Sequence, residues 1–273
     1  MNLNVPKLFR RTLRVIAVLA TLHVVILAVL YFKQEHFFFN PKVLDKNYVF
    51  EFEAPFEELN INVDDGISLN ALLFKTEAPK GLIVYYHGNA GAIHDWGKRA
   101  PLYLENNYDI LFVDYRGYGK SNGKYSNSKQ LLDDAQKVYA FAKTRYKEEQ
   151  IIVLGFSLGS GLATYVASKN NPKMLIINAP YYSWKTLISE QIAPPIPAFI
   201  VKYDIPTHTY IKNVTCPIKI FHGSRDFLVD VEENSKKLQA LAPENIELTI
   251  IHDAGHNGIH ITKQYYDALK ELL

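Results

Sequence analysis

The chain has 273 residues and a formal net charge of +2, with 48% hydrophobic and 21% charged residues. This composition suits one α/β domain with a large buried core and excludes a disordered chain, and the small net charge without a basic stripe excludes nucleic acid as a partner. The single cysteine, Cys216, excludes an intrachain disulfide.

The N-terminal segment is first basic and then apolar. Residues 15–32 are apolar except for Thr21 and His23. This stretch is longer than the apolar part of a cleaved signal peptide, and no small-x-small cleavage site follows it. We therefore predict an uncleaved transmembrane signal anchor over residues 15–32, rather than a cleaved signal. A juxtamembrane linker is expected over residues 33–49.

The charges around this stretch predict its orientation. Basic residues tend to stay on the cytoplasmic side of a membrane helix. We expect a single-pass membrane protein whose residues 1–14 are cytoplasmic and whose remaining domain is extracytoplasmic, with membrane lipids as its neighbours. The opposite orientation is the alternative. The cations that precede the stretch are Lys7, Arg10, Arg11 and Arg14.

From residue 50 onward, predicted strands and helices alternate. Residues 59–63 and 69–74 form a predicted hairpin, and short apolar runs indicate strands buried on both faces. The pattern predicts a doubly wound, mostly parallel α/β sheet over residues 50–273. The buried strands are expected at 82–86, 110–113, 151–155, 175–177, 218–221 and 248–251, and helices at 96–106, 128–146, 158–169, 231–241 and 262–272.

The connection over about residues 181–212 is too long for a simple crossover. Long insertions in compact domains are usually functional, so we predict a short lid over the active site. An irregular surface excursion is the alternative. Four apolar residues of this segment are expected to guide an apolar substrate: Ile192, Ile196, Phe199 and Ile200.

The strongest chemical signal is the pentapeptide Gly155-Phe156-Ser157-Leu158-Gly159. It follows a predicted buried strand and precedes a predicted helix. A serine on such a tight turn is lifted above the sheet, and glycines two residues to either side let the backbone pass without a clash. Ser157 is therefore the predicted nucleophile.

A nucleophilic serine needs a base and an acid that orients the base, and both are expected later in the chain. Asp226 follows the strand at 218–221, and His256 follows the last strand. Asp230 is the rival acid, although its place near a helix start suits an N-cap, and Asp204 is a third choice. Two further histidines lie four residues before and four residues after His256, a spacing that could place three metal ligands on one helix face. The intervening glycines argue against such a helix, so no metal is expected. These neighbours are His252 at the strand end and His260, expected to open the last helix.

The developing negative charge on the substrate needs hydrogen-bond donors. A glycine-rich loop, Tyr86-His87-Gly88-Asn89-Ala90-Gly91, follows the first central strand. The expected oxyanion hole consists of the backbone N–H groups of Asn89 and of Leu158, the residue after the nucleophile.

With these residues, the chain resembles the α/β-hydrolase superfamily over about residues 50–273, and most of all the membrane-anchored ABHD and Bem46-like members. The resemblance implies hydrolysis of acyl esters or thioesters, often lipidic, without a cofactor. One departure is Asn178, near which many relatives have an acidic residue. The matching stretches are Tyr86 to Gly91, Asp114-Tyr115-Arg116-Gly117-Tyr118-Gly119-Lys120-Ser121, Gly155 to Gly159, His222-Gly223-Ser224-Arg225-Asp226 and Gly255-His256-Asn257.

The leading hypothesis is a membrane-anchored serine hydrolase that cleaves acyl carboxylic esters through a Ser157-Asp226-His256 triad and an acyl-enzyme. The alternatives are an acyl-thioesterase acting on proteins, a serine peptidase and a catalytically inactive membrane scaffold. Fold alone does not choose among the enzymes. The presence of nucleophile, acid, base and oxyanion loop together argues against the scaffold.

Overall fold

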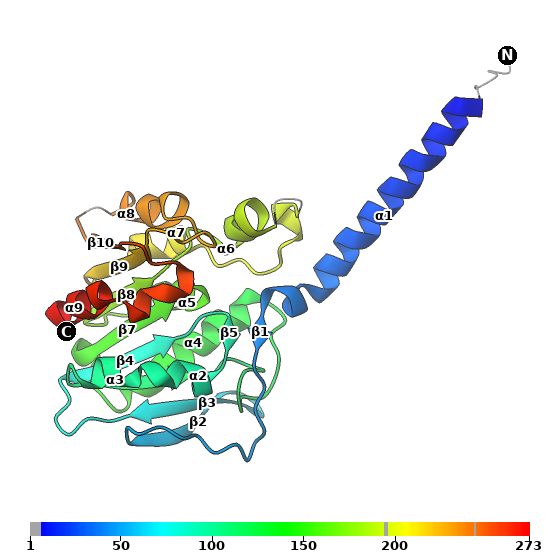
Figure 1. Cartoon of the computed structure of the whole chain (residues 1–273). Coiled ribbons are helices and arrows are strands. Elements are labelled where there is room, and N and C mark those ends of the chain that lie inside the picture. Colours follow the sequence, from blue (N-terminus) through cyan, green and yellow to red (C-terminus); the bar gives the residue numbers. More distant parts are fainter. Residues whose placement is uncertain (1–6, 194–195, 243) are drawn as a thin grey trace.

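A computed structural model describes residues 7–193, 196–242 and 244–273. The first six residues of the predicted cytoplasmic N-terminus and residues 194–195 of the predicted lid lie outside the described residues. A long helix, α1 (Lys7–Phe38), projects from an α/β domain (Figure 1). Its stretch Phe9–His36 is long and apolar enough to cross a membrane, judged by length and composition, and its most apolar window is not buried.

Eight strands form the central sheet, in the order β10-β9-β8-β7-β4-β6-β3-β2. β3 pairs antiparallel with β2 and β6, and every other neighbouring pair is parallel. The predicted hairpin and the predicted mostly parallel sheet are both confirmed. The strands are β2 (Phe56–Asp64), β3 (Ile67–Phe74), β4 (Gly81–Tyr86), β6 (Tyr108–Val113), β7 (Ile151–Phe156), β8 (Met174–Asn178), β9 (Ile218–Gly223) and β10 (Ile246–Ile251).

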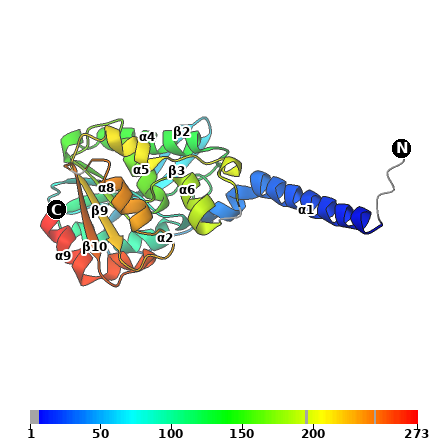
Figure 2. The ribbon, with the colours of Figure 1, turned by 90° about the horizontal axis from the view of Figure 1, so that it is seen from above.

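Helices cover both faces of the sheet (Figure 2). In β4, Val84 and Tyr86 belong to the core on one face, while Ile83 and Tyr85 belong to the core on the other. This alternation explains the continuous apolar run, because each face of the strand meets helices. The first face is covered by α4 (Ser128–Lys143), α5 (Leu158–Ala167) and α8 (Lys237–Gln239), and the second by α2 (Ile93–Trp96), α3 (Ala100–Leu104) and α9 (Lys263–Leu272).

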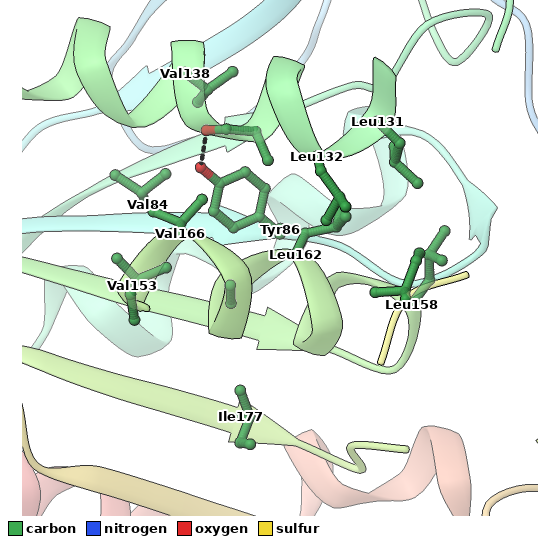
Figure 3. Packing of buried hydrophobic residues seen from close by; sticks show 14 of the residues in the cluster. Val84, Tyr86, Leu131, Leu132, Val138, Val153, Leu158, Leu162, Val166 and Ile177 are labelled. Carbon is green, nitrogen blue, oxygen red and sulfur yellow. Dashed lines mark hydrogen bonds between the residues drawn. The ribbon is translucent and has the colours of Figure 1, made fainter. Parts of the chain in front are cut away.

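The layer between β4, α4 and α5 fixes the element that carries the nucleophile. Figure 3 shows Tyr86 inserted among the leucine and valine side chains of both helices. Its hydroxyl donates a 2.6 Å hydrogen bond to the carbonyl of Ala135 in α4. Leu158 and Leu162 of α5 are completely buried in the same core. The first turn of α5 is thereby held rigidly over the end of β7.

Helix boundaries differ from the sequence prediction where local breaks occur. The helix expected over 96–106 is divided into α2, a 3₁₀ turn at Gly97–Arg99 and α3. The helix expected over 231–241 consists of a π-helical turn, Glu232–Lys236, and α8. Asn127 caps α4 by accepting a 3.0 Å hydrogen bond from the Gln130 N–H.

The predicted lid segment consists of short helical pieces packed on the domain near the base of α1 (Figure 1). Ile196 is buried in the core, whereas Ile192 and Phe199 are exposed. Ile196 is therefore not available to a substrate at the surface. The described pieces are α6 (Trp184–Thr186), a π-helical turn (Leu187–Ile192), 3₁₀ turns (Ala198–Ile200, Ile211–Asn213) and α7 (Thr207–Tyr210).

The segment directly after α1 also packs on the domain, where the sequence predicts a linker. Phe39 is buried against Trp184 and Tyr203. The strand β1 (Asn40–Pro41) then pairs in parallel with β5 (Ala90–Gly91). These contacts bring the base of α1 to the loop that follows β4.

Candidate active site

Ser157 lies on a strained turn between β7 and α5. Its backbone has φ 51° and ψ −116°, a conformation that non-glycine residues adopt rarely and usually at functional sites. The turn is held by a 3.0 Å hydrogen bond from the Ser157 N–H to the Asn178 carbonyl. A Cβ on Gly159 would lie 2.0 Å from the Tyr86 carbonyl oxygen, so only glycine fits there. The flanking glycines of the motif are thus required by close backbone approach.

The structure brings Ser157, His256 and Asp226 together from three separate connections. His256 begins a 3₁₀ turn, His256–Ile261, after β10, and Asp226 lies in the loop after β9. The His256 Nε2 is 3.0 Å from the Ser157 Oγ, and its Nδ1 is 2.7 Å from the Asp226 Oδ2. Both distances are within hydrogen-bond range, so a continuous chain of three groups runs from the serine to the carboxylate.

The Asp226 carboxylate is held in its ionised form. Burial alone would raise its pKa, but hydrogen bonds from His222 and His256, with the positive charge that His256 can carry, lower the pKa overall. Its Oδ1 also accepts hydrogen bonds from the N–H groups of Leu228 at 3.0 Å and Val229 at 2.8 Å. A buried, ionised acceptor can orient a histidine and stabilise its protonated form.

His222 is a further member of this network, and the sequence analysis includes it in a matching stretch without giving it a role at the triad. Its Nε2 lies 2.8 Å from the Val229 carbonyl oxygen and 3.2 Å from the Asp226 Oδ2. Because a carbonyl only accepts, we assign the proton to Nε2, and the Ser235 hydroxyl then donates to Nδ1 at 2.6 Å. The sequence signal that could have indicated this role is the position of His222, which lies at the end of β9, four residues before Asp226.

The rival acids have other partners. The exposed Asp230 accepts a 2.9 Å hydrogen bond from the Glu233 N–H, as a helix cap does. Asp204 forms a 3.1 Å ion pair with Lys185 in the lid segment. Neither carboxylate is joined to a histidine by the hydrogen bonds of the described residues.

The neighbouring histidines have different surroundings. His252 is exposed, and His260 lies in the 3₁₀ turn rather than at the start of the last helix, which begins at Lys263. The glycine-containing loop closes as a tight 3₁₀ turn and delays the helix. Burial, together with the nearby charges of Arg99 and His256, lowers the pKa of His260 to about 3. Within the described part of the chain, no three histidine, cysteine or acidic side chains are grouped to hold a metal ion.

The predicted oxyanion donors lie at the start of α5 and on the loop that follows β4. Leu158 is the first residue of α5, so its N–H has no acceptor within the helix and lies at the positive end of the helix dipole. The loop with Asn89 is held from the neighbouring loop, where the Tyr118 hydroxyl donates to the Asn89 carbonyl at 2.8 Å. The Tyr115 hydroxyl likewise donates to the His87 carbonyl at 2.6 Å.

Buried Asp114 fixes the far end of the same loop. Its Oδ1 accepts a 2.9 Å hydrogen bond from the Ile93 N–H and lies 3.4 Å from the His87 Nε2. Desolvation by burial raises the pKa of the Asp114 carboxyl. The motif from Asp114 to Ser121 therefore supports the glycine-rich loop.

Comparison with known proteins gives related sequences and folds. A family model described as serine aminopeptidase, S33, matches residues 77–209. Alpha/beta hydrolase domain-containing protein 17C of Xenopus tropicalis is 30% identical over 198 residues, covering 70% of this chain and 61% of the relative. A putative alpha/beta hydrolase of Acanthamoeba polyphaga mimivirus is 30% identical over 190 residues, covering 66% of this chain and 68% of the relative. The chain thus spans about three fifths of the length of the 17C relatives.

Among solved structures, an esterase of Pyrococcus furiosus superposes with a TM-score of 0.69 at 21% identity, covering 86% of this chain and 97% of the esterase. Est1E of Butyrivibrio proteoclasticus, with bound ferulic acid, gives a TM-score of 0.63 at 23% identity over 78% of this chain and 97% of the neighbour. At these identities the structures establish the shared fold.

Proposed function

Because the chain belongs to the α/β-hydrolase family, we propose that it is a membrane-anchored serine hydrolase that cleaves acyl carboxylic esters. The observation that carries the proposal is the hydrogen-bonded chain from the Ser157 Oγ through His256 to Asp226, with distances of 3.0 and 2.7 Å. A serine becomes a nucleophile when an adjacent base removes its proton and an acid holds that base in the correct tautomer.

The proposed reaction has two halves. The Ser157 Oγ attacks the ester carbonyl while the His256 Nε2 takes its proton, and the N–H groups of Asn89 and Leu158 stabilise the oxyanion. His256 then gives this proton to the leaving alcohol, and an acyl-enzyme remains on Ser157. Water attacks the acyl group with His256 as base, and collapse of the second tetrahedral intermediate releases the acid and restores Ser157. Asp226 stays ionised throughout and stabilises the imidazolium.

Exposed apolar side chains, two of them close to triad residues in the chain, support an acyl substrate. Phe227 directly follows Asp226 and is 96% exposed, and Ile261 ends the turn that starts at His256 and is 87% exposed. In the lid segment, Phe199 is 79% exposed. Exposed large apolar side chains are available to contact an apolar ligand or a membrane. A lid that carries Phe199 and Ile192 would guide an acyl chain toward Ser157.

The N-terminal helix supports a membrane location. We propose that α1 is an uncleaved anchor with the basic residues on the cytoplasmic side and the catalytic domain outside, as the positive-inside rule predicts. An anchored domain would meet lipidic esters at the bilayer surface.

Labelling and substrate profiling test the proposal. A fluorophosphonate probe should label the wild-type protein and not Ser157→Ala. The matched control is Ser160→Ala, which should still be labelled, since the Ser160 hydroxyl donates a 2.6 Å hydrogen bond to the Ser157 carbonyl. Equal labelling of Ser157→Ala would refute the nucleophile. Turnover should then be compared for p-nitrophenyl esters of graded chain length, an acyl thioester and a peptide amide. Preference for the thioester would assign the thioesterase alternative.

A peptidase is the second candidate, favoured by the description of the matched family model as a serine aminopeptidase. Faster turnover of the peptide amide than of every ester would select it.

A further inference from the structure

The C-terminal part of α1 is bound to the lid segment by a buried amide. Gln34 is 1% exposed. Its Nε2 donates to the Ile200 carbonyl at 3.1 Å, and its Oε1 accepts from the Lys202 N–H at 2.8 Å. The neighbouring Glu35 carboxylate pairs with the Lys202 Nζ at 3.3 Å and accepts from the Tyr203 hydroxyl at 3.2 Å. Because a buried amide is costly to leave unpaired, this contact fixes the helix end relative to the lid.

The segment that follows, residues 39–44, is bound to the active-site loops by its backbone. The Lys42 N–H donates to the Gly91 carbonyl at 3.0 Å, next to the β1–β5 pairing. The Gly119 N–H donates to the Lys42 carbonyl at 2.8 Å, and the Leu44 N–H donates to the Gly119 carbonyl at 2.9 Å. These bonds place residues 39–44 between the glycine-rich loop and the loop that carries Tyr118.

The backbone on the C-terminal side of Asn89 is thus held twice. β1 pairs with Ala90 and Gly91, and the Tyr118 hydroxyl donates to the Asn89 carbonyl. Tyr118 itself precedes Gly119, which residues 39–44 bind. An oxyanion donor acts only if it is preorganised at the position of the developing charge, and small displacements reduce the rate. The segment therefore bears on the placement of the Asn89 N–H.

Away from these bonds, the base of α1 and the domain are separated by a hollow of about 770 Å³, whose lining includes Val29, Phe32, Pro41, Arg116 and Tyr125. Broad packing does not fill this space. The polar contacts of Gln34 and Glu35, the packing of Phe39 and the backbone bonds of residues 42–44 therefore join this end of the helix to the domain.

We propose that residues 34–44 are a positioning segment of the active site, which connects the membrane helix to the lid on one side and to the oxyanion loop on the other. The inference rests on the proposed serine-hydrolase function. The segment does not touch substrate: it acts through Asn89, whose N–H it holds in place. Its loss lowers kcat and leaves substrate binding nearly unchanged.

Proline substitutions in the full-length protein test this proposal, because proline removes one backbone donor and fits an extended segment. Lys42→Pro removes the N–H that donates to the Gly91 carbonyl. The matched control, Val43→Pro, removes an N–H that takes no part in the backbone hydrogen bonds between residues 42–44 and the domain. Lys42→Ala controls for the exposed side chain. With a water-soluble short-chain ester, Lys42→Pro should lose about 10- to 100-fold in kcat, with KM within about twofold, while both controls stay near wild type. Equal kcat in Lys42→Pro and Val43→Pro would overturn the proposal.

Hydrogen exchange separates this inference from the proposed function. In Lys42→Pro, the amides of residues 88–93 should exchange at least about tenfold faster than in Val43→Pro, whether or not the protein cleaves an ester. Leu44→Pro, which removes the bond to Gly119, is the second variant and should accelerate exchange at residues 117–119 first. Unchanged exchange in both variants refutes the positioning role even if the wild type is active. Accelerated exchange in the variants of an inactive wild type would instead support the positioning role of the segment and refute the serine-hydrolase function.

Discussion

Replacing Asp226 by asparagine isolates the charge that the proposed mechanism requires. The carboxylate Oδ2 lies 2.7 Å from the His256 Nδ1, in a site that is largely closed to solvent. When His256 becomes an imidazolium, two unit charges about 4 Å apart attract by about 4 kcal/mol at an effective dielectric constant of about 20. Loss of this attraction from the transition state corresponds to about a thousandfold in rate.

The amide adds a second defect. A nitrogen in place of Oδ2 would face the N–H groups of both His222 and His256, so that donor meets donor. His256 would then turn to the tautomer whose Nε2 carries the proton and cannot accept one from Ser157. We expect kcat to fall by about 10³- to 10⁴-fold in total. The amide oxygen still accepts from Leu228 and Val229, so the fold should survive with a loss of about 1–3 kcal/mol in unfolding free energy.

The assay is kcat on a p-nitrophenyl ester, with melting temperature measured on the same samples. The matched control is Asp230→Asn, since that exposed side chain only caps the Glu233 N–H. The control should keep its activity within about twofold, as surface changes usually do. Near-normal turnover in Asp226→Asn together with collapse in Asp230→Asn would refute the assignment and move the acid to Asp230.

Three further results are expected. A chelator should leave hydrolysis unchanged, and activity lost to the chelator and restored by zinc would instead implicate the histidines around His256. His260, with a folded pKa of about 3 against a usual 6.5, binds its proton mainly in the unfolded chain, so stability falls as pH is lowered from 6.5 toward 3. His260→Phe should make this acid denaturation shallower by up to about 1.4 kcal/mol per pH unit, and an unchanged slope would contradict the burial of a neutral ring. Protease added to intact cells or spheroplasts should digest the catalytic domain, and survival until permeabilisation would reverse the proposed topology.

The order and type of the sheet elements could be predicted because the relevant pattern is local. Each central strand is buried on both faces, so it appears in the sequence as a continuous apolar run between turn residues. Ser157 could be singled out for a similar reason: the strained turn demands glycine at 155 and 159, and close contacts at both positions explain that demand. Asp226 and His256 follow from chain order and from the common edge at which parallel strands end.

Other features depend on contacts that leave little trace in the sequence. His222 stands at a strand end like His87, and only folding brings its Nε2 to Asp226. The helix expected over 96–106 is interrupted by a 3₁₀ turn that begins at Gly97, and an added Cβ there would lie 2.6 Å from the ring of Phe52. A packing partner 45 positions earlier in the chain cannot be read from helical periodicity.

The segment after α1 illustrates the limit most clearly, because its contacts run through the backbone. Lys42 and Val43 have exposed side chains and look like a linker by composition, yet the peptide groups around them bind Gly91 and Gly119. Any residue other than proline supplies the same N–H and C=O groups, so hydropathy carries no signal for such pairing. A domain boundary drawn from composition at residue 50 therefore cuts through hydrogen bonds that belong to the domain. By hydrogen bonding rather than by composition, the domain begins at Gln34 in α1, whose buried side-chain amide binds the backbone of Ile200 and Lys202.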